Sequence, residues 1–257
     1  MNAMAPADDE ALAAAAAAAA ANVIVADERT RVDIARGVDC VRKILAATDE
    51  EFADRKWMLQ RVREYGLAHR NWPEFSRYTT WKNASEFGLL QLPTEFVDFA
   101  MYVSAIGIKT AVEIGVWTGS SSYFLAAVLT RADPALVYHM VDIQNYVLGF
   151  DEFSRLLNLH LHIPGTSADL VGQEFDLVFI DGDHSYDGAL ADYANLGRYC
   201  RRAVAFHDIR AVSYDALNGG TVRMWREFRD SAVQDMRILQ FTHDPQPWMG
   251  IGLGVRA

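Results

Sequence analysis

The chain has 257 residues, and its 24 Lys and Arg residues against 34 Asp and Glu residues give a formal net charge of -10. This length suits one large domain, or one domain with a smaller helical extension, at roughly 100–200 residues per domain. The basic residues are scattered along the chain. Because broad electrostatic attraction to nucleic acid needs a concentrated positive surface, we expect no nucleic-acid partner.

The N-terminal residues and the cysteines predict that the protein is located in the cytoplasm. Residues 1–21 form a low-complexity, alanine-rich tail, in which the run 11–21 follows acidic residues. A secretory signal needs basic residues at that point, and a membrane span needs about 18–20 apolar residues, so we expect no membrane partner. The two cysteines, Cys40 and Cys200, are too few for a disulfide framework, and we expect buried thiols in a cytoplasmic protein.

Residues 22–93 are predicted to be a helical and loop extension. Apolar residues recur at three- and four-residue steps, at Val32, Ala35, Val38, Val41 and Leu45. This spacing predicts helices up to about residue 67, which either pack on a core or serve as a lid or an oligomer contact. The segment 68–93 reads as an ordered loop, whose aromatic residues either line a ligand site or pack against the core; they are Trp72, Tyr78 and Trp81.

Residues 94–257 alternate strand and helix patterns after a helix predicted over 93–106. The predicted strands are 110–114, 137–141, 159–163, 175–180, 203–206, 237–242 and 249–255, and the predicted helices between them are 120–129, 150–157, 186–199 and 221–230. Repeated strand–helix units predict an α/β, Rossmann-like, seven-stranded and mostly parallel sheet with helices on both faces. No helix separates the last two strands, so the sheet is expected to include an antiparallel C-terminal strand.

A glycine-containing loop follows the first predicted strand. Glu113, Gly115 and Gly119 stand at the spacing E-x-G-x-x-x-G, and the second strand ends at Asp142. Glycines between a strand and a helix let the backbone approach a ligand closely, and a carboxylate after the next strand can accept hydrogen bonds from ribose hydroxyls. A dinucleotide loop needs G-x-G-x-x-G, but position 117 is Trp117. The spacing is instead typical of class I S-adenosylmethionine-dependent methyltransferases.

Polar side chains follow the fourth and fifth predicted strands. Asp181 and His184 come after one strand, and His207 and Asp208 come after the next. Adjacent parallel strands lie about 4.7–4.9 Å apart, so the two carboxylates are expected to converge and to bind Mg²⁺, Ca²⁺ or Mn²⁺, with His207 as a further ligand. His184 could then take a proton from a hydroxyl. The alternative is helix capping, by Asp183 or Ser185.

From about Trp81 onward the chain resembles the class I methyltransferases that include cephalosporin hydroxylase-type proteins and macrolide-sugar O-methyltransferases. The segments that carry this resemblance are Gln91–Pro93, EIGVWTGSSS at 113–122, VDI at 141–143, FIDGDHSYDGALADY at 179–193, FHDI at 206–209, GGTVRMWREF at 219–228 and GIGLGV at 250–255. In that group an acid and a histidine in D-x-x-H supply a metal ligand and a general base, which match Asp181 and His184. A pair of acidic or amide groups after the fifth strand completes the metal site, whereas this chain has His207 and Asp208 there.

The resemblance implies an S-adenosylmethionine-binding domain over 94–257 and an O-methyltransferase that modifies a sugar, as nucleotide sugar or glycoside, or a related natural-product intermediate. It also implies a homo-oligomer. The expected catalytic residues are His184 and Asp181, and the expected metal ligands are Asp181, His207 and Asp208. The expected cofactor-binding residues are Gln91, Glu113, Gly115, Trp117, Gly119, Ser120, Ser121, Asp142, Ser167, Asp169 and Asp181.

Three other functions are compatible with parts of this pattern. A non-catalytic accessory protein would keep the cofactor loop and would tolerate the loss of His184. An NAD-dependent oxidoreductase is disfavoured by Trp117 and by the missing third glycine. An N-methyltransferase would need a pocket for a neutral amine and no metal.

Overall fold

The computed structural model describes residues 26–232, 235–243 and 248–256, so the predicted tail 1–21 lies outside the described part. Seven strands form one sheet in the order β3-β2-β1-β4-β5-β7-β6. They are β1 (Thr110–Ile114), β2 (Val137–Val141), β3 (Leu159–His162), β4 (Leu177–Ile180), β5 (Ala203–His207), β6 (Met236–Phe241) and β7 (Ile251–Arg256). β1 to β5 are parallel, and β7 runs antiparallel between β5 and β6. The predicted fold class is confirmed.

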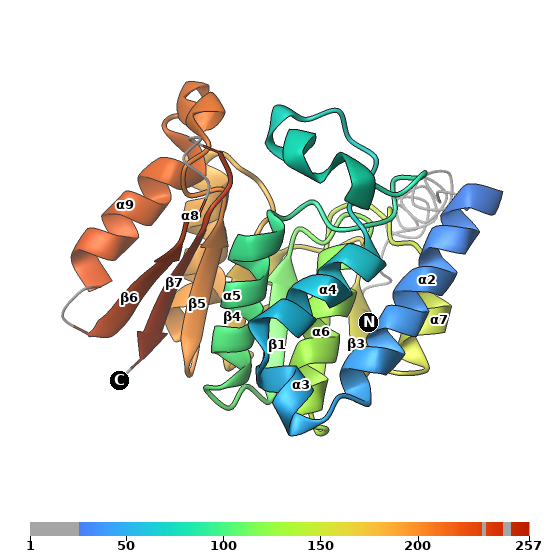
Figure 1. Ribbon diagram of the computed structural model, residues 1–257. Coiled ribbons are helices and arrows are strands. Elements are labelled where there is room, and N and C mark those ends of the chain that lie inside the picture. Colours follow the sequence, from blue (N-terminus) through green and yellow to red (C-terminus); the bar gives the residue numbers. More distant parts are fainter. Residues whose placement is uncertain (1–25, 233–234, 244–247, 257) are drawn as a thin grey trace, which may run out of the picture.

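Helices cover both faces of this sheet (Figure 1). One face carries α2 (Glu28–Leu45), α4 (Arg55–Tyr65), α5 (Pro93–Ser104) and α6 (Ser120–Ala132). The other carries α8 (Tyr186–Asn195) and α9 (Gly220–Ala232). The shorter helices are α3 (Asp49–Ala53), α7 (Phe150–Ser154) and the 3-10 turns η1 (Pro73–Trp81), η2 (Ser167–Leu170), η3 (Gly197–Tyr199) and η4 (Val212–Ala216).

The central strand β4 shows how the two faces are filled. Leu177 and Phe179 belong to the core under α5 and α6, whereas Val178 and Ile180 belong to the core under α8 and α9. All four side chains are buried. A strand covered on both faces needs an unbroken apolar run, and this is why the segment could be recognised in the sequence.

The N-terminal helices share a core with α5 and α6. Val38 and Val41 of α2 lie in the same hydrophobic cluster as Phe96 and Phe124. The structure therefore shows the packing role of the extension, and its role as a lid or an oligomer contact stays a prediction.

The predicted apolar stripe of α2 is wrong at its N-terminal end. Val32 is 60% exposed and Ala35 is exposed, while Asp33 and Ile34 are buried. The rest of the stripe faces the core as predicted, with Val38 and Val41 buried, and at the N-terminal end the Asp33 carboxylate points inward to accept hydrogen bonds from Ser85.

The aromatic residues of the segment 68–93 do not all have the same role: some pack against the core and one lines a cavity. Tyr78 and Trp81 pack against the core, and Trp72 is 41% exposed and lines a cavity described below. Both cysteines are free and buried, as expected. Within the described ranges, no helix is both long enough and apolar enough to cross a bilayer.

A buried carboxylate fastens α5 to the closing strands. Glu95 is 1% exposed, and it accepts hydrogen bonds from the backbone N–H of His243, at 2.8 Å, and of Gly250, at 3.1 Å. These two residues flank the connection between β6 and β7, so one side chain holds that connection against the first turn of α5.

We expect Glu95→Ala to lower the free energy of unfolding by about 2–4 kcal/mol, because the buried Gly250 N–H and the partly buried His243 N–H both lose their acceptor. Urea unfolding followed by circular dichroism measures this change, with the exposed Glu50→Ala as the control. Equal unfolding midpoints for the two variants would show that the Glu95 contacts contribute nothing to stability.

Candidate active site

Two cavities meet at the carboxyl ends of β1 and β4. The larger, of about 730 Å³, extends along β2 and α8, and the smaller, of about 470 Å³, lies between the η1 and η4 segments. Both are lined by Gly115, Trp117, Asp181 and His184. Two ligands, one in each cavity, would therefore meet at these four residues.

This place is the point at which the strand order reverses. β1 has β2 on one side and β4 on the other, and α/β sheets bind ligands outside the carboxyl ends of such strands. Gly115 has φ +86°, and a Cβ atom at this position would lie 2.3 Å from the carbonyl oxygen of Asp181. A side chain at 115 would push the β1 loop away from β4, so the first loop glycine is required by close approach.

The loop after β1 is tied to Asp142, and the predicted cofactor role of this residue stays a prediction. The Trp117 N–H donates to Asp142 Oδ2 at 2.8 Å, and the Gln144 N–H donates to Oδ1 at 3.0 Å. Each carboxylate oxygen can accept a second hydrogen bond, and Asp142 lines the larger cavity. Both oxygens can therefore still accept hydrogen bonds from a ligand.

Glu113 lies beneath the loop, and it lines neither cavity. It is fully buried and accepts hydrogen bonds from the hydroxyls of Ser121, at 2.6 Å, and Tyr138, at 2.7 Å. Burial raises its pKa to about 7, and the two hydroxyl donors oppose this rise. The carboxyl group therefore braces the start of α6.

The other predicted cofactor residues separate into lining residues and scaffold residues. Ser120, Ser121 and Gln91 line the smaller cavity, and Ser167 lines the larger one. Gly119, with φ +80°, caps α6 at its N-terminus. Asp169 lines neither cavity, because its carboxylate accepts hydrogen bonds from the Thr166 backbone and hydroxyl.

Gln91 carries an unsatisfied acceptor into the site. Its Nε2 donates to Asp181 Oδ2 at 2.9 Å, while its Oε1 is buried without a hydrogen-bond partner among the described residues. Leaving a buried polar atom unpaired is costly, so this oxygen is suited to a ligand that donates a hydrogen bond.

The polar residues after β4 and β5 converge as predicted. His207 Nδ1 lies 3.0 Å from Asp181 Oδ1 and 3.5 Å from Asp208 Oδ2. His184 Nε2 lies 2.8 Å from Asp208 Oδ2, although its geometry is not that of a hydrogen bond, and 3.7 Å from Asp181 Oδ1. Ligand atoms of Asp181, His184 and Asp208 all lie within 4.8 Å of one another, so the donor set fits one small cation.

The charges in this cluster are balanced internally. Burial lowers the pKa of His184 and His207, but the two carboxylates outweigh it and raise the pKa of His184 to about 9 and that of His207 well above its usual value. Burial raises the pKa of Asp181 and Asp208, but the histidines outweigh it and lower both. The carboxylates therefore favour the protonated form of both histidines, and the histidines favour the ionised form of both carboxylates.

The capping alternative applies to two neighbouring residues of this segment. Ser185 Oγ accepts the Gly188 N–H at 3.0 Å as the N-cap of α8, and Asp183 Oδ1 accepts the Ser185 N–H at 2.9 Å. Asp181 and His184 are left for the cluster. The capping interpretation is therefore confirmed for Ser185, and the catalytic role of Asp181 and His184 stays a prediction.

Tyr214 is a site residue that sequence reasoning missed. Its ring stacks on His184, with centroids 4.5 Å apart, and its hydroxyl donates to Asp208 Oδ2 at 3.3 Å. It lines the smaller cavity together with Trp72 and Trp248. No spacing in the sequence indicates this contact, because the η4 segment reaches the site only through the turn after β5.

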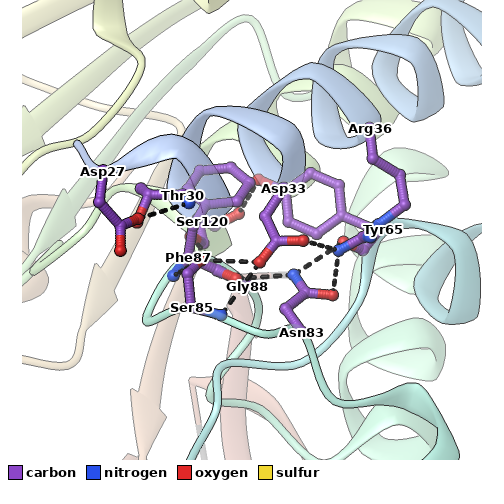
Figure 2. Close-up of polar contacts among 10 residues, drawn as sticks. All are labelled: Asp27, Thr30, Asp33, Arg36, Tyr65, Asn83, Ser85, Phe87, Gly88 and Ser120. Atoms are coloured by element: carbon purple, nitrogen blue, oxygen red, sulfur yellow. Dashed lines mark hydrogen bonds and ion pairs between the residues drawn. The ribbon is translucent and has the colours of Figure 1, made fainter.

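A polar network connects α2 to the segment 83–88, which leads into the site (Figure 2). Asp33 accepts hydrogen bonds from the Ser85 N–H, at 3.1 Å, and from the Ser85 hydroxyl, at 2.7 Å, and it pairs with Arg36 at 2.5 Å. Arg36 also donates to Asn83, whose amide donates to Phe87 O at 2.6 Å. The network therefore fixes the segment 83–87 against α2.

The same segment continues into the site. The Gly88 N–H donates to Ser120 Oγ at 3.1 Å, and the Tyr65 hydroxyl donates to Ser120 O at 3.0 Å. Gly88 has φ +144°, and a Cβ atom here would lie 2.5 Å from the carbonyl carbon of Leu67. Since Gln91 follows three residues later, α2 and α4 help to set where Gln91 enters the site.

Residues 112–209 match a family model described as a methyltransferase domain. No curated protein matches the chain. Among solved structures, the O-methyltransferase of Bacillus cereus in complex with SAH is 16% identical, with 85% of this chain and 96% of that chain covered and a TM-score of 0.50.

Two further structures have the same fold. The O-methyltransferase TomG of Streptomyces achromogenes, involved in tomaymycin synthesis and bound to SAM, is 16% identical over 90% of this chain and 100% of that chain, with a TM-score of 0.50. The SAH-bound methyltransferase PaMTH1 of Podospora anserina is 12% identical over 100% of both chains, also with a TM-score of 0.50.

The chain shares its fold with these methyltransferase structures. Residues 112–209, which contain Glu113, the glycine loop and the whole Asp–His cluster, match a methyltransferase domain, in agreement with the predicted class. The narrower group of sugar-modifying enzymes stays a prediction.

We expect Asp33→Asn to loosen the segment 83–92, because a neutral amide accepts the two Ser85 hydrogen bonds more weakly than a carboxylate. Hydrogen exchange of that segment, read by mass spectrometry, should become faster by about tenfold or more. Asp39→Asn is the matched control, since Asp39 lies on the same helix but is exposed and pairs with Lys43. Unchanged exchange in Asp33→Asn would show that α2 does not hold this segment.

The raised pKa of Glu113 predicts a pH-dependent contribution to stability. The folded carboxyl, with a pKa of about 7, keeps a proton that the unfolded chain releases near pH 4.5. This contribution is therefore fully present below pH 4.5 and is lost as the pH rises through 7, by up to about 3 kcal/mol.

Urea unfolding of the native protein and of Glu113→Gln at pH 5, 6 and 7.5 tests this dependence. We expect the stability difference between the two proteins to change over this range, and the other carboxyls to cancel in the comparison. Parallel curves would mean that Glu113 titrates as an ordinary carboxyl.

Proposed function

We propose that the protein transfers the methyl group of S-adenosylmethionine to a hydroxyl oxygen of a small acceptor, with the cofactor in the larger cavity and the acceptor in the smaller one. The observation that carries this proposal is the wall that the cavities share at Gly115, Trp117, Asp181 and His184. A methyl group can pass directly between two ligands only where their cavities meet, because the reacting atoms must align.

The larger cavity has the size and the polar groups that a nucleoside cofactor needs. Its volume of about 730 Å³ is in the range of cofactor sites. Asp142 would accept hydrogen bonds from the ribose hydroxyls, and the tight turn at Gly115 would admit the sulfur end of the cofactor. When bound, S-adenosylmethionine supplies a methyl group activated by a positively charged sulfur. Glu113 and Gly119 support this site from below.

The chain's residues would position the acceptor oxygen and take its proton. A divalent cation, when held by Asp181 and Asp208 with His184 or His207 beside it, would lower the pKa of the hydroxyl and replace the positive charge that the histidines now provide. His184 would then be neutral and could accept the hydroxyl proton while the methyl carbon bonds to the oxygen and its bond to the sulfur breaks, which leaves S-adenosylhomocysteine. Tyr214, stacked on the imidazole, would keep the ring oriented.

The smaller cavity favours an acceptor with both a flat apolar face and hydroxyl groups. Trp72, Tyr214 and Trp248 contribute aromatic surface, and Asp181 and Asp208 contribute acceptors. We propose a sugar, as nucleotide sugar or glycoside, or a related natural-product intermediate, methylated by a cytoplasmic homo-oligomer. The non-catalytic accessory protein is the second candidate, and it differs in having no need of His184.

The first test is calorimetric titration with S-adenosylhomocysteine and, separately, NADH, each with and without EDTA. We expect micromolar binding of S-adenosylhomocysteine and none of NADH. NADH binding alone would support the oxidoreductase instead.

The second test measures methyl transfer from labelled S-adenosylmethionine to a panel of glycosides and nucleotide sugars. We expect His184→Ala to bind S-adenosylhomocysteine nearly as well as the native protein but to lose at least about 100-fold in rate, as the removal of a general base does. Removal of the cation with EDTA should lower the rate and Mg²⁺ should restore it. A fully active His184→Ala protein would exclude His184 as the base.

A further inference from the structure

We propose that Asp192 recognises the 6-amino group of the cofactor's adenine and so sets the nucleobase specificity of the larger cavity. This inference rests on the proposed function, because it takes that cavity as the S-adenosylmethionine site. Asp192 lies on α8, lines the larger cavity and is only 9% exposed.

One oxygen of Asp192 is held and the other is free. Ser167 Oγ donates to Oδ1 at 2.6 Å, and Asn195 Nδ2 donates to Ser167 Oγ at 2.9 Å. Oδ2 receives no hydrogen bond from the described part of the chain. It lies next to Gly182, because a Cβ atom there would be 3.5 Å from Oδ2, and Gly182 lines the same cavity.

The position of the other polar groups assigns this end of the cavity to the base. Asp142 is the ribose acceptor, and Gly115, Asp181 and His184 mark the end at which the methyl group must leave. The remaining end is bounded by Ser167, Asp192 and Asn195, with the exposed apolar Ile143 at 66% exposure as a flank for a flat ring. Asp169, which the sequence predicts as a cofactor-binding residue, instead takes part in the capping box of η2.

The chemistry of the free oxygen selects one type of purine edge. An ionised carboxylate only accepts hydrogen bonds, and the exocyclic amine of adenine only donates them. Burial raises the pKa of Asp192 to about 6, against the hydrogen bond from Ser167, so the group is ionised above that pH. A 6-oxo purine would place a carbonyl oxygen against the carboxylate and would be rejected.

The experiment compares ligands that differ only at the purine 6-position. Calorimetry at pH 7.5 measures the affinity of the native protein for S-adenosylhomocysteine, for S-inosylhomocysteine and for the analogue whose purine has hydrogen at that position. We expect each change of the 6-amino group to weaken binding by about tenfold to a hundredfold. Equal affinity for all three ligands would overturn the inference without any variant.

A pair of variants on α8 then assigns the discrimination to one side chain. Asp192→Asn can donate to a 6-oxo group, so we expect its preference for S-adenosylhomocysteine over S-inosylhomocysteine to shrink by at least tenfold. Asp187→Asn is the matched control, because Asp187 is exposed on the same helix and should keep the native preference. A native preference retained by a folded Asp192→Asn protein would overturn the inference.

The two proposals fail differently. If the native protein binds none of the three nucleosides, the proposed cofactor is wrong, and the role of Asp192 is wrong with it. If S-adenosylhomocysteine binds with micromolar affinity but the 6-position has no effect, only the role of Asp192 is overturned.

Discussion

The close contact between the β1 loop and the end of β4 is the constraint on which the site depends. At Gly115 the backbone passes so near the Asp181 carbonyl that no side chain fits between them. This contact places the glycine loop after β1 beside Asp181 after β4, and both line the two cavities. Asp142, the α6 N-terminus and the Asp–His cluster are arranged about it, so that the two cavities meet at one place.

The second organising feature is the electrostatic balance of the Asp–His cluster. Two carboxylates after neighbouring strands would repel each other in a buried site, and the protein offsets this with two histidines from the same strand ends. Such a cluster can exchange imidazolium charge for the charge of a cation without changing its net balance much.

The sequence was informative where local pattern decides the structure. The apolar run before Asp181 could only be a strand buried on both faces, and parallel strands necessarily bring their carboxyl ends together. The convergence of Asp181 with Asp208 was therefore predictable, and so was the sheet.

Side-chain contacts between distant segments could not be predicted in the same way. The sequence suggests that Asp33 is a solvent-facing helix residue, yet it is buried and accepts a hydrogen bond from Ser85. Because Ser85 lies 52 positions away in the chain, no local pattern reveals this contact. Tyr214 and Asp192 reach their partners only through the final packing of η4 and α8. Asp169 was expected to bind the cofactor, but its carboxylate accepts hydrogen bonds from Thr166 and lines neither cavity.

The position of β7 has a consequence for how the molecule is made. The last strand of the chain lies between β5 and the edge strand β6, so the strand synthesised earlier joins the sheet only through the one synthesised later. During translation, β6 must wait beside an incomplete sheet until residues 251–256 leave the ribosome. The loss of β7 would therefore detach β6 from the sheet as well, because β6 pairs with β7 alone among the described strands.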